Sequence, residues 1–183
     1  YVHIPWCIKK CPYCDFNSHQ AGTTIPQQAY VQALINDLEA DLAWVQGRTL
    51  QSIFFGGGTP SLFSGTAIAE ILDAAEKLIG FDSAIEITLE ANPGTVEQQK
   101  FADFHSAGVN RLSIGVQSFN DQQLQQLGRI HNGTDALNAI DTAKAVVFNN
   151  FNIDLMHGLP GQTIVQAEAD IELAIESGAQ HIS

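Results

Sequence analysis

The segment Ser52–Pro60, with the sequence SIFFGGGTP, determines the class of fold to which this 183-residue chain belongs. A short apolar run, typical of a buried strand, leads directly into three glycines. Ser64 is then expected to be a helix N-cap, because its hydroxyl can accept a hydrogen bond from the first helical turn. The helix that follows would bury Ile68, Ile71, Leu72, Ala75 and Ile79. Strand, glycine turn and amphipathic helix together predict a βα unit.

The same unit recurs along the chain. Further strands are expected over residues 1–5, 85–90, 111–117 and 151–156, and residues 180–183 begin a sixth. Helices are expected around Tyr30, Leu34, Leu38 and Leu42, from about 96 to 107, in a short and a longer stretch through 147, and from about 165 to 177. Strands that alternate with helices predict a parallel sheet with right-handed crossovers.

The expected fold class is therefore α/β, closed either as a doubly wound sheet or as a (β/α) barrel. A complete eight-stranded barrel takes ~250 residues, so five units within 183 residues favour a partial barrel. The sixth strand is only begun in this chain, and an unfinished parallel strand leaves an exposed edge. We therefore expect the C-terminal part of the natural protein to follow Ser183.

Charge and composition exclude several classes of function. Lys and Arg number 8 against 20 Asp and Glu, which gives a formal net charge of −12. A nucleic-acid binder or a protein held on anionic lipid would need a basic surface instead. No stretch approaches the ~18 consecutive apolar residues of a membrane span. Apolar residues make up 45% of the chain, which is enough for a sizeable core.

Cys7, Cys11 and Cys14 lie in one loop with the spacing C-x3-C-x2-C. An odd number of closely spaced cysteines fits a reduced compartment, the cytoplasm, and a metal or cluster better than a disulfide framework. Three thiolates can bind three corners of an iron–sulfur cube and leave one position for another ligand. Two alternatives stay open here: a zinc site completed by His3 or His19, and thiols without a metal.

Glycines and polar residues gather where the other predicted strands end. These ends carry Gly56–Pro60, Glu90–Pro93, Gly115–Ser118 and Asn152–Asp154. The carboxyl ends of parallel strands converge on one face of a barrel, where barrel enzymes bind their ligands. Glycines there let a ligand approach the backbone amides, whereas the carboxylates can equally be helix caps. Their combination with the cysteine loop predicts a ligand site on that face.

Longer motifs identify the family that the sequence resembles. Besides the cysteine spacing and GGGTP, they are YVHIPWC at 1–7, EANP at 90–93, NRLSIGVQSF at 110–119 and NIDLMHGLP at 152–160. They resemble the radical S-adenosylmethionine (SAM) superfamily over essentially the whole chain. Within it, they resemble the branch of oxygen-independent coproporphyrinogen III oxidases and radical SAM heme chaperones. The resemblance implies a partial (β/α)6-type barrel, with residues 1–183 as the radical SAM core domain.

The resemblance also implies the cofactors and their contacts. A 4Fe–4S cluster would be held by Cys7, Cys11 and Cys14, with the fourth iron bound by the amino and carboxylate groups of SAM. One electron from the cluster would cleave SAM to methionine and a 5′-deoxyadenosyl radical. The residues implied to contact SAM are Tyr1, Gly57, Gly58, Thr59, Glu90, Gln117, Arg129 and Asp154. His131 and His157 lie near these positions and are expected to be structural, and no catalytic residue is assigned.

One position separates the two relatives in this branch. The oxidases carry a further cysteine two residues after the last cluster ligand, and Phe16 stands there in this chain. The runs CPYCDFNS at 11–18, GTPSLF at 58–63 and GRIH at 128–131 also resemble the chaperones. The resemblance therefore implies a protein that binds heme and transfers it to an acceptor protein, with cluster and SAM required.

An electron donor such as a flavodoxin or ferredoxin would supply electrons to the cluster. The residues that contact heme are not assigned. The alternative within the branch is a coproporphyrinogen III oxidase, which converts its substrate to protoporphyrinogen IX by oxidative decarboxylation. A non-catalytic zinc or iron–sulfur protein is a remote alternative.

Overall fold

Parallel strands form the main sheet of the computed structural model, which describes residues 1–95, 98–146 and 148–183. In space the strands follow their order in the sequence: β1 (Val2–Ile4), β4 (Leu50–Gly57), β5 (Phe81–Ala91), β6 (Arg111–Gln117), β7 (Phe151–Leu155) and β8 (His181–Ile182). Every neighbouring pair in this order is parallel. A doubly wound sheet reverses its strand order at a switch point. This sheet keeps one order throughout its described strands, so the expected α/β class is confirmed as a partial barrel.

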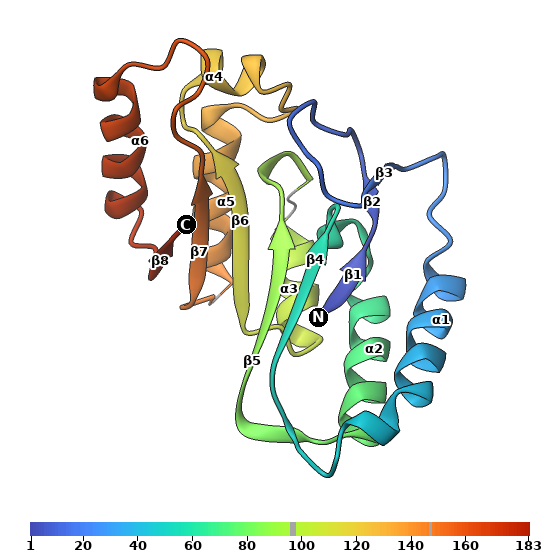
Figure 1. Ribbon diagram of the computed structural model, residues 1–183. Coiled ribbons are helices and arrows are strands. Elements are labelled where there is room, and N and C mark those ends of the chain that lie inside the picture. Colours follow the sequence, from blue (N-terminus) through green and yellow to red (C-terminus); the bar gives the residue numbers. More distant parts are fainter. Residues whose placement is uncertain (96–97, 147) are drawn as a thin grey trace.

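Helices connect the strands on the outside of the sheet. They are α1 (Gln27–Ala40), α2 (Gly65–Leu78), α3 (Gln98–Ser106), α4 (Asp121–Gln126), α5 (Gly133–Ala145) and α6 (Ile164–Glu176). Figure 1 shows the long strands pointing toward one end of the molecule, with the loop that holds the cysteines (dark blue) at that end. Within the described residues, no helix has the length and hydropathy that a membrane span needs.

Local sequence signals account for most helix positions. The Ser64 hydroxyl accepts a hydrogen bond from the Ala67 amide, which confirms the predicted cap of α2. The apolar positions predicted for this helix are buried, except that Ile79 follows its last turn and is only half-buried. In the first helix the predicted stripe ends early, because Leu42 lies in a separate 3-10 turn at Leu42–Trp44.

The strands and helices differ from expectation mainly at their ends. β4 and β5 begin earlier than predicted, at Leu50 and Phe81. A short pair of parallel strands, β2 (Trp6–Cys7) and β3 (His19–Gln20), closes the base of the segment that was expected to be only a loop. The predicted start of a helix near 96 and the predicted helix end at 147 lie outside the described residues.

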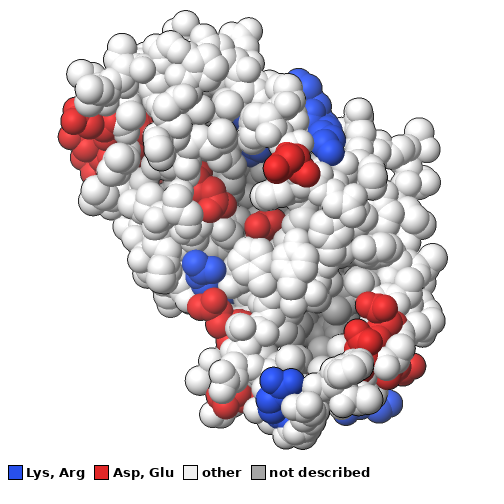
Figure 2. Space-filling model, viewed as in Figure 1, with Lys and Arg blue, Asp and Glu red and all other residues white. Residues whose placement is uncertain are grey.

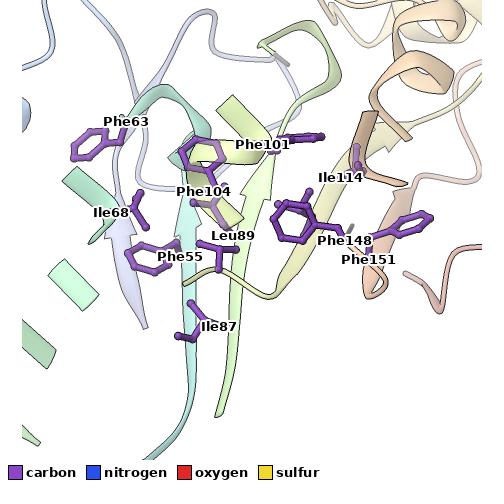
Figure 3. Packing of buried hydrophobic residues seen from close by; sticks show 14 of the residues in the cluster. Phe55, Phe63, Ile68, Ile87, Leu89, Phe101, Phe104, Ile114, Phe148 and Phe151 are labelled. Carbon is purple, nitrogen blue, oxygen red and sulfur yellow. The ribbon is translucent and has the colours of Figure 1, made fainter. Parts of the chain in front are cut away.

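Large apolar side chains pack between the sheet and the helices (Figure 3). Phe55 and Leu89 extend from neighbouring strands toward Ile68 of α2 and Phe104 of α3, and all four side chains are buried. Burial of each such side chain is worth about 1.5–3 kcal/mol. This packing therefore determines which face of each strand points toward the helices.

Side chains on a strand alternate between its two faces. Along β6, Leu112, Ile114 and Val116 belong to the buried core. The residues between them, Ser113 and Gly115, therefore point to the opposite, inner face of the sheet. The same alternation in β5 and β7 turns Glu90 and Asp154 to the inner face. The hydrophobic core thus decides which polar residues can form a site.

Candidate functional site

A cavity of about 320 Å³ lies at the carboxyl ends of the strands. It is lined by every predicted site residue except Tyr1, namely Cys7, Cys11, Cys14, Gly57, Gly58, Thr59, Glu90, Gln117, Arg129 and Asp154. We call it the strand-end cavity. Figure 2 shows this face hollowed in its middle, with acidic side chains inside the hollow and basic side chains near its upper right edge. Residues from separate strands and loops are therefore brought to one place, as the sequence predicts.

The glycine turn after β4 lies directly against the strand that leads to the first cysteine. The Gly58 amide donates to the Ile4 carbonyl (2.7 Å), and the Thr59 amide donates to the Trp6 carbonyl (2.8 Å). A Cβ on Gly58 would lie 2.6 Å from the same Trp6 oxygen, so a side chain does not fit there. Gly57 has φ +116°, a backbone conformation that favours glycine. Close approach of two backbones is what requires glycine at this turn.

The cysteine loop, residues 7–18, forms one wall of the cavity. Cys7, Cys11 and Cys14 are partly exposed and unpaired, and the Lys10 ammonium group holds the loop by donating to the carbonyls of Phe16 (3.2 Å) and Ser18 (3.0 Å). Sulfur donors on one wall of an open cavity are the ligand set that an iron–sulfur cluster takes. The donor chemistry and the adjoining space therefore fit a cluster with an open coordination position.

The zinc alternative is not supported by the geometry of the described residues. Neither His3 nor His19 is among those that line the cavity. The His3 ring instead forms hydrogen bonds with the Asn17 carbonyl (2.8 Å) and with the Tyr1 hydroxyl (3.2 Å). In the described parts of the chain, no three cysteine, histidine or carboxylate groups are grouped to share one metal ion. A cube-shaped cluster makes no such demand, since each cysteine binds a different iron.

Arg129 connects the cysteine loop to the strand ends. It lies between α4 and α5, and one terminal nitrogen, Nη1, is 3.7 Å from the Cys11 sulfur and 3.3 Å from the Tyr13 hydroxyl. The other, Nη2, donates to the Asn92 side-chain oxygen and to the Gly115 carbonyl (2.8 Å). Its Nε–H is buried and has no hydrogen-bond partner among the described residues. The Arg129 side chain lines the cavity, so its positive charge can act on an anionic group there.

Asn92 and Gly115 lie in the predicted strand ends and also line the cavity, although neither is among the residues implied to contact SAM. Asn92 accepts from Arg129 and donates to the Thr59 hydroxyl (2.9 Å), so it links two predicted contacts. A Cβ on Gly115 would lie 3.0 Å from both Asn92 Oδ1 and Gln117 Nε2. Asn92 lies in the motif EANP and Gly115 in the motif NRLSIGVQSF. Their positions in these motifs are the signal that could have identified them as contacts. Ser113 and Tyr13 also line the cavity without having been predicted.

Gln117 has an unusual backbone conformation. Its φ is +68°, in the left-handed region that residues other than glycine rarely adopt. The register between β6 and β7 shifts between Ile114 and Gln117, and the Gln117 carbonyl accepts from the Met156 amide (2.8 Å). Such irregularities redirect a side chain at the end of a strand, and the Gln117 side chain lines the cavity. Strain of this kind is common at functional sites.

Two carboxylates occupy the inner face of the sheet. Asp154 accepts from the Ser113 hydroxyl (3.0 Å) and the Asn152 amide (2.7 Å), and Glu90 accepts from the Gly57 backbone amide (3.2 Å). Burial raises the pKa of Asp154, although both hydrogen bonds oppose the rise. Burial also raises the pKa of Glu90 to about 7; the bond from Gly57 opposes this and the nearby charge of Asp154 adds to it. These groups suit a ligand that brings hydroxyl donors.

The Glu90 carboxyl gives a testable dependence of stability on pH. The folded protein holds this proton more tightly than the unfolded chain, in which the carboxyl keeps its usual pKa of 4.5. The free energy of unfolding therefore falls as pH rises from 4.5 to about 7. Glu90→Gln removes this loss, so the variant gains stability relative to wild type across that range, by roughly 2 kcal/mol, and the gain levels off above it.

Urea unfolding of the ligand-free protein at a series of pH values measures this difference. His131, whose pKa burial lowers to about 4, is present in both proteins, so its own titration largely cancels. The Asp154 carboxyl interacts with Glu90, so the measured difference includes that interaction. A stability difference that stays constant between about pH 4.5 and 8 would contradict the buried, proton-holding state of Glu90.

Tyr1 and the two nearby histidines lie outside the cavity lining. Tyr1 is 76% exposed at the rim, where its ring stacks on Phe54 with centroids 6.3 Å apart. A Cβ on Gly56 would lie within 3.1 Å of both the Tyr1 ring and Glu90 Oε2, so Tyr1 is next to the cavity wall. His131 is buried and its Nε2 donates to the Val116 carbonyl (3.0 Å), which is a structural role. His157 is exposed.

Comparison with known proteins places these features in context. The sequence profile of the Radical SAM superfamily matches residues 1–174. The whole chain is 55% identical to the Heme chaperone HemW of Haemophilus influenzae, covering 49% of that protein, and 51% identical to that of Escherichia coli, covering 48%. The mitochondrial Radical S-adenosyl methionine domain-containing protein 1 of Bos taurus is 41% identical over 90% of the chain and 37% of its own length. The chain thus spans about half the length of the HemW proteins it matches.

Solved structures show the same architecture. The coproporphyrinogen III oxidase HemN of Escherichia coli, a radical SAM enzyme, superimposes with a TM-score of 0.88 over 100% of this chain and 43% of its own, at 27% identity. The radical SAM methyltransferase TsrM of Kitasatospora setae superimposes with a TM-score of 0.69 at 13% identity, over 99% of this chain and 35% of its own.

Proposed function

The chain belongs to the radical SAM superfamily, and from that premise we propose that residues 1–183 are the radical SAM core domain of a heme chaperone. In this proposal the protein binds heme and passes it to an acceptor protein, with cluster and SAM required for the transfer. One support is the full-chain similarity to proteins named heme chaperone, at 55% and 51% identity. The other is Phe16, which lines the cavity where the oxidases carry a cysteine.

Membership of the superfamily implies a 4Fe–4S cluster and SAM as cofactors. When bound, they supply one-electron cleavage of SAM to a reactive organic radical. Cys7, Cys11 and Cys14 would hold the cluster from one wall of the strand-end cavity, leaving the space beside them for SAM. The remaining residues then bind and orient SAM and limit the access of water.

The polar residues of the cavity would contact different groups of SAM, according to their chemistry. The guanidinium group of Arg129 would attract the carboxylate of SAM, since it is a cationic group in the lining of the cavity. Glu90 and Asp154 would accept hydrogen bonds from the ribose hydroxyls, and the amide of Gln117 can donate or accept beside them. Gly57, Gly58 and Thr59 would meet the methionine end along the backbone. Tyr1 would cover the cavity from its rim.

Phe16 is the observation that carries the choice of chaperone over oxidase. Its side chain is 60% exposed and lines the cavity within the cysteine loop. The oxidase branch carries a cysteine at this position, according to the resemblance drawn from the sequence. A phenyl ring can neither supply a thiol nor donate a proton there, which argues against coproporphyrinogen decarboxylation. The oxidase remains the second candidate because its structure superimposes on the whole chain with a TM-score of 0.88.

One experiment separates the two candidates. The full-length protein, with its cluster reconstituted anaerobically, is supplied with SAM, a strong reductant and coproporphyrinogen III, and the porphyrin products are analysed by mass spectrometry. We expect unchanged coproporphyrinogen, and tight heme binding by the same preparation in a spectroscopic titration. HemN serves as the positive control for the assay. Decarboxylated product would make the oxidase correct, with Phe16 a tolerated difference.

The proposal also includes partners and a compartment. A one-electron donor such as a flavodoxin or ferredoxin would reduce the cluster, and the heme acceptor would be a second protein. Three free cysteines support a reduced compartment, the cytoplasm. The formal net charge of −12 argues against nucleic acid as a partner.

A further inference from the structure

Asp170 is a buried carboxylate that the proposed function does not use. It lies in α6, is 4% exposed, and is not among the described residues that line the strand-end cavity. The Ser118 hydroxyl donates to its Oδ2 (2.7 Å) and the Phe119 backbone amide donates to its Oδ1 (2.8 Å). A buried carboxylate is costly unless hydrogen bonds compensate it. The two hydrogen bonds therefore connect α6 to the segment that contains Ser118 and Phe119.

That segment begins immediately after Gln117. The Ser118 oxygen that donates to Asp170 also accepts from the Asn120 amide (3.0 Å), so both oxygens of the carboxylate hold the turn between β6 and α4. On the other side, the Gln117 carbonyl accepts from Met156 at the end of β7. Gln117 is thus held at its own carbonyl and through the two residues that follow it.

The conformation held in this way is the strained one. Gln117 has φ +68°, and a residue other than glycine keeps such a conformation only where its surroundings enforce it. The same conformation directs the amide side chain into the cavity, close to Gly115 and Arg129. The Ser118 amide also donates to the Val116 carbonyl (2.9 Å), which closes a turn around Gln117. Loss of the contacts from Asp170 to Ser118 and Phe119 would weaken this turn and free the Gln117 side chain to move out of the cavity.

We infer that Asp170 is a positioning residue, which holds Gln117 in its left-handed conformation through Ser118 and Phe119 and so places the Gln117 amide against SAM. The inference rests on the proposed SAM contact of Gln117. It differs from a purely structural role, in which Asp170 would only attach α6 to the sheet. A structural role alone would lower stability without acting through Gln117.

A double-mutant cycle on the full-length, cluster-loaded protein separates the two roles, with the dissociation constant for SAM as the readout. Asp170→Asn removes one of the two acceptor oxygens while keeping the shape of the side chain. We expect it to weaken SAM binding by about tenfold in the wild-type background. In a Gln117→Ala background it should have little further effect, because the side chain that it positions is already absent.

A second readout needs neither cluster nor SAM. Hydrogen exchange of the Phe119 amide in the ligand-free protein should become faster in Asp170→Asn, because its acceptor becomes neutral and the hydrogen bond weakens. The matched control is Ser177→Ala, which removes two hydrogen bonds at the end of α6. These run from Ser177 to the Ala174 carbonyl (2.6 Å) and from the Ala179 amide to Ser177 (3.3 Å), and neither is linked to Gln117. It should change neither SAM binding nor exchange at Phe119.

The possible outcomes are distinct. Equal weakening by Asp170→Asn in both backgrounds, or no weakening in wild type, would overturn the positioning role while leaving the SAM site intact. If Gln117→Ala itself leaves SAM binding unchanged, the SAM contact of Gln117 is wrong and the inference falls with it. Should Asp170→Asn fold poorly, Ser118→Ala removes the hydroxyl that Asp170 holds and is expected to give the same pattern in the same cycle.

Discussion

Replacing Cys11 with serine is expected to remove the iron–sulfur cluster and to reduce SAM cleavage to background while the barrel stays folded. A hydroxyl is a hard and weakly acidic ligand that replaces a thiolate poorly on iron. Cys11 lies in a loop, partly exposed and outside the hydrophobic core, so its loss leaves core packing unchanged. Iron and acid-labile sulfide content after anaerobic reconstitution measure the cluster, and circular dichroism reports on the fold.

His19→Ala is the matched control for this variant. His19 lies in the same segment, in β3, and would complete the metal site only if the site bound zinc. We expect this variant to keep its full iron content and its SAM cleavage. A full iron complement in Cys11→Ser would show that the ligand assignment is wrong. Loss of metal in both variants would instead favour the zinc alternative.

The second large effect is expected from a single methyl group at the glycine turn. In Gly58→Ala the new Cβ would lie 2.6 Å from the Trp6 carbonyl oxygen and 2.9 Å from the Pro5 carbonyl carbon. Both are backbone atoms, so they cannot move aside as a flexible side chain would. The strand that leads to Cys7 must therefore shift away from β4. Overpacking of this kind costs about 1–3 kcal/mol of stability.

The functional consequence of Gly58→Ala exceeds its effect on stability. Because the shift displaces Cys7 relative to the cavity, SAM binding is expected to weaken by roughly tenfold or more, and SAM cleavage to fall on the order of 100-fold. Equilibrium binding and single-turnover cleavage measure the two effects separately.

Gly22→Ala is the control for Gly58→Ala. Gly22 lies just after β3, and a Cβ there meets nothing within 4 Å. It should therefore bind and cleave SAM as wild type does. Wild-type SAM binding by Gly58→Ala would show that the close approach at the glycine turn does not position the cysteine loop.

Local sequence patterns predict those features of the fold that depend on residues close together in the chain. Ser64 caps α2 as expected, because a cap depends only on neighbours within one helical turn. The alternation of apolar and polar residues along β6 likewise determined which side chains point to the cavity once a core existed on one face. Helix and strand ends were less well determined, since pairing with a neighbouring strand extended β4 back to Leu50.

The βα units, the cysteine spacing and the residue types at the strand ends follow from the sequence alone, because each of these is set by residues close together in the chain. The strand order, the contact of Arg129 with Cys11 across 118 positions, and the exposure of Tyr1 at the rim arise only in the folded protein. The same is true of the left-handed backbone of Gln117 and of the hydrogen bond between Asp170 and the turn that follows it. These contacts join distant segments, and the packing of the whole sheet against its helices sets their geometry.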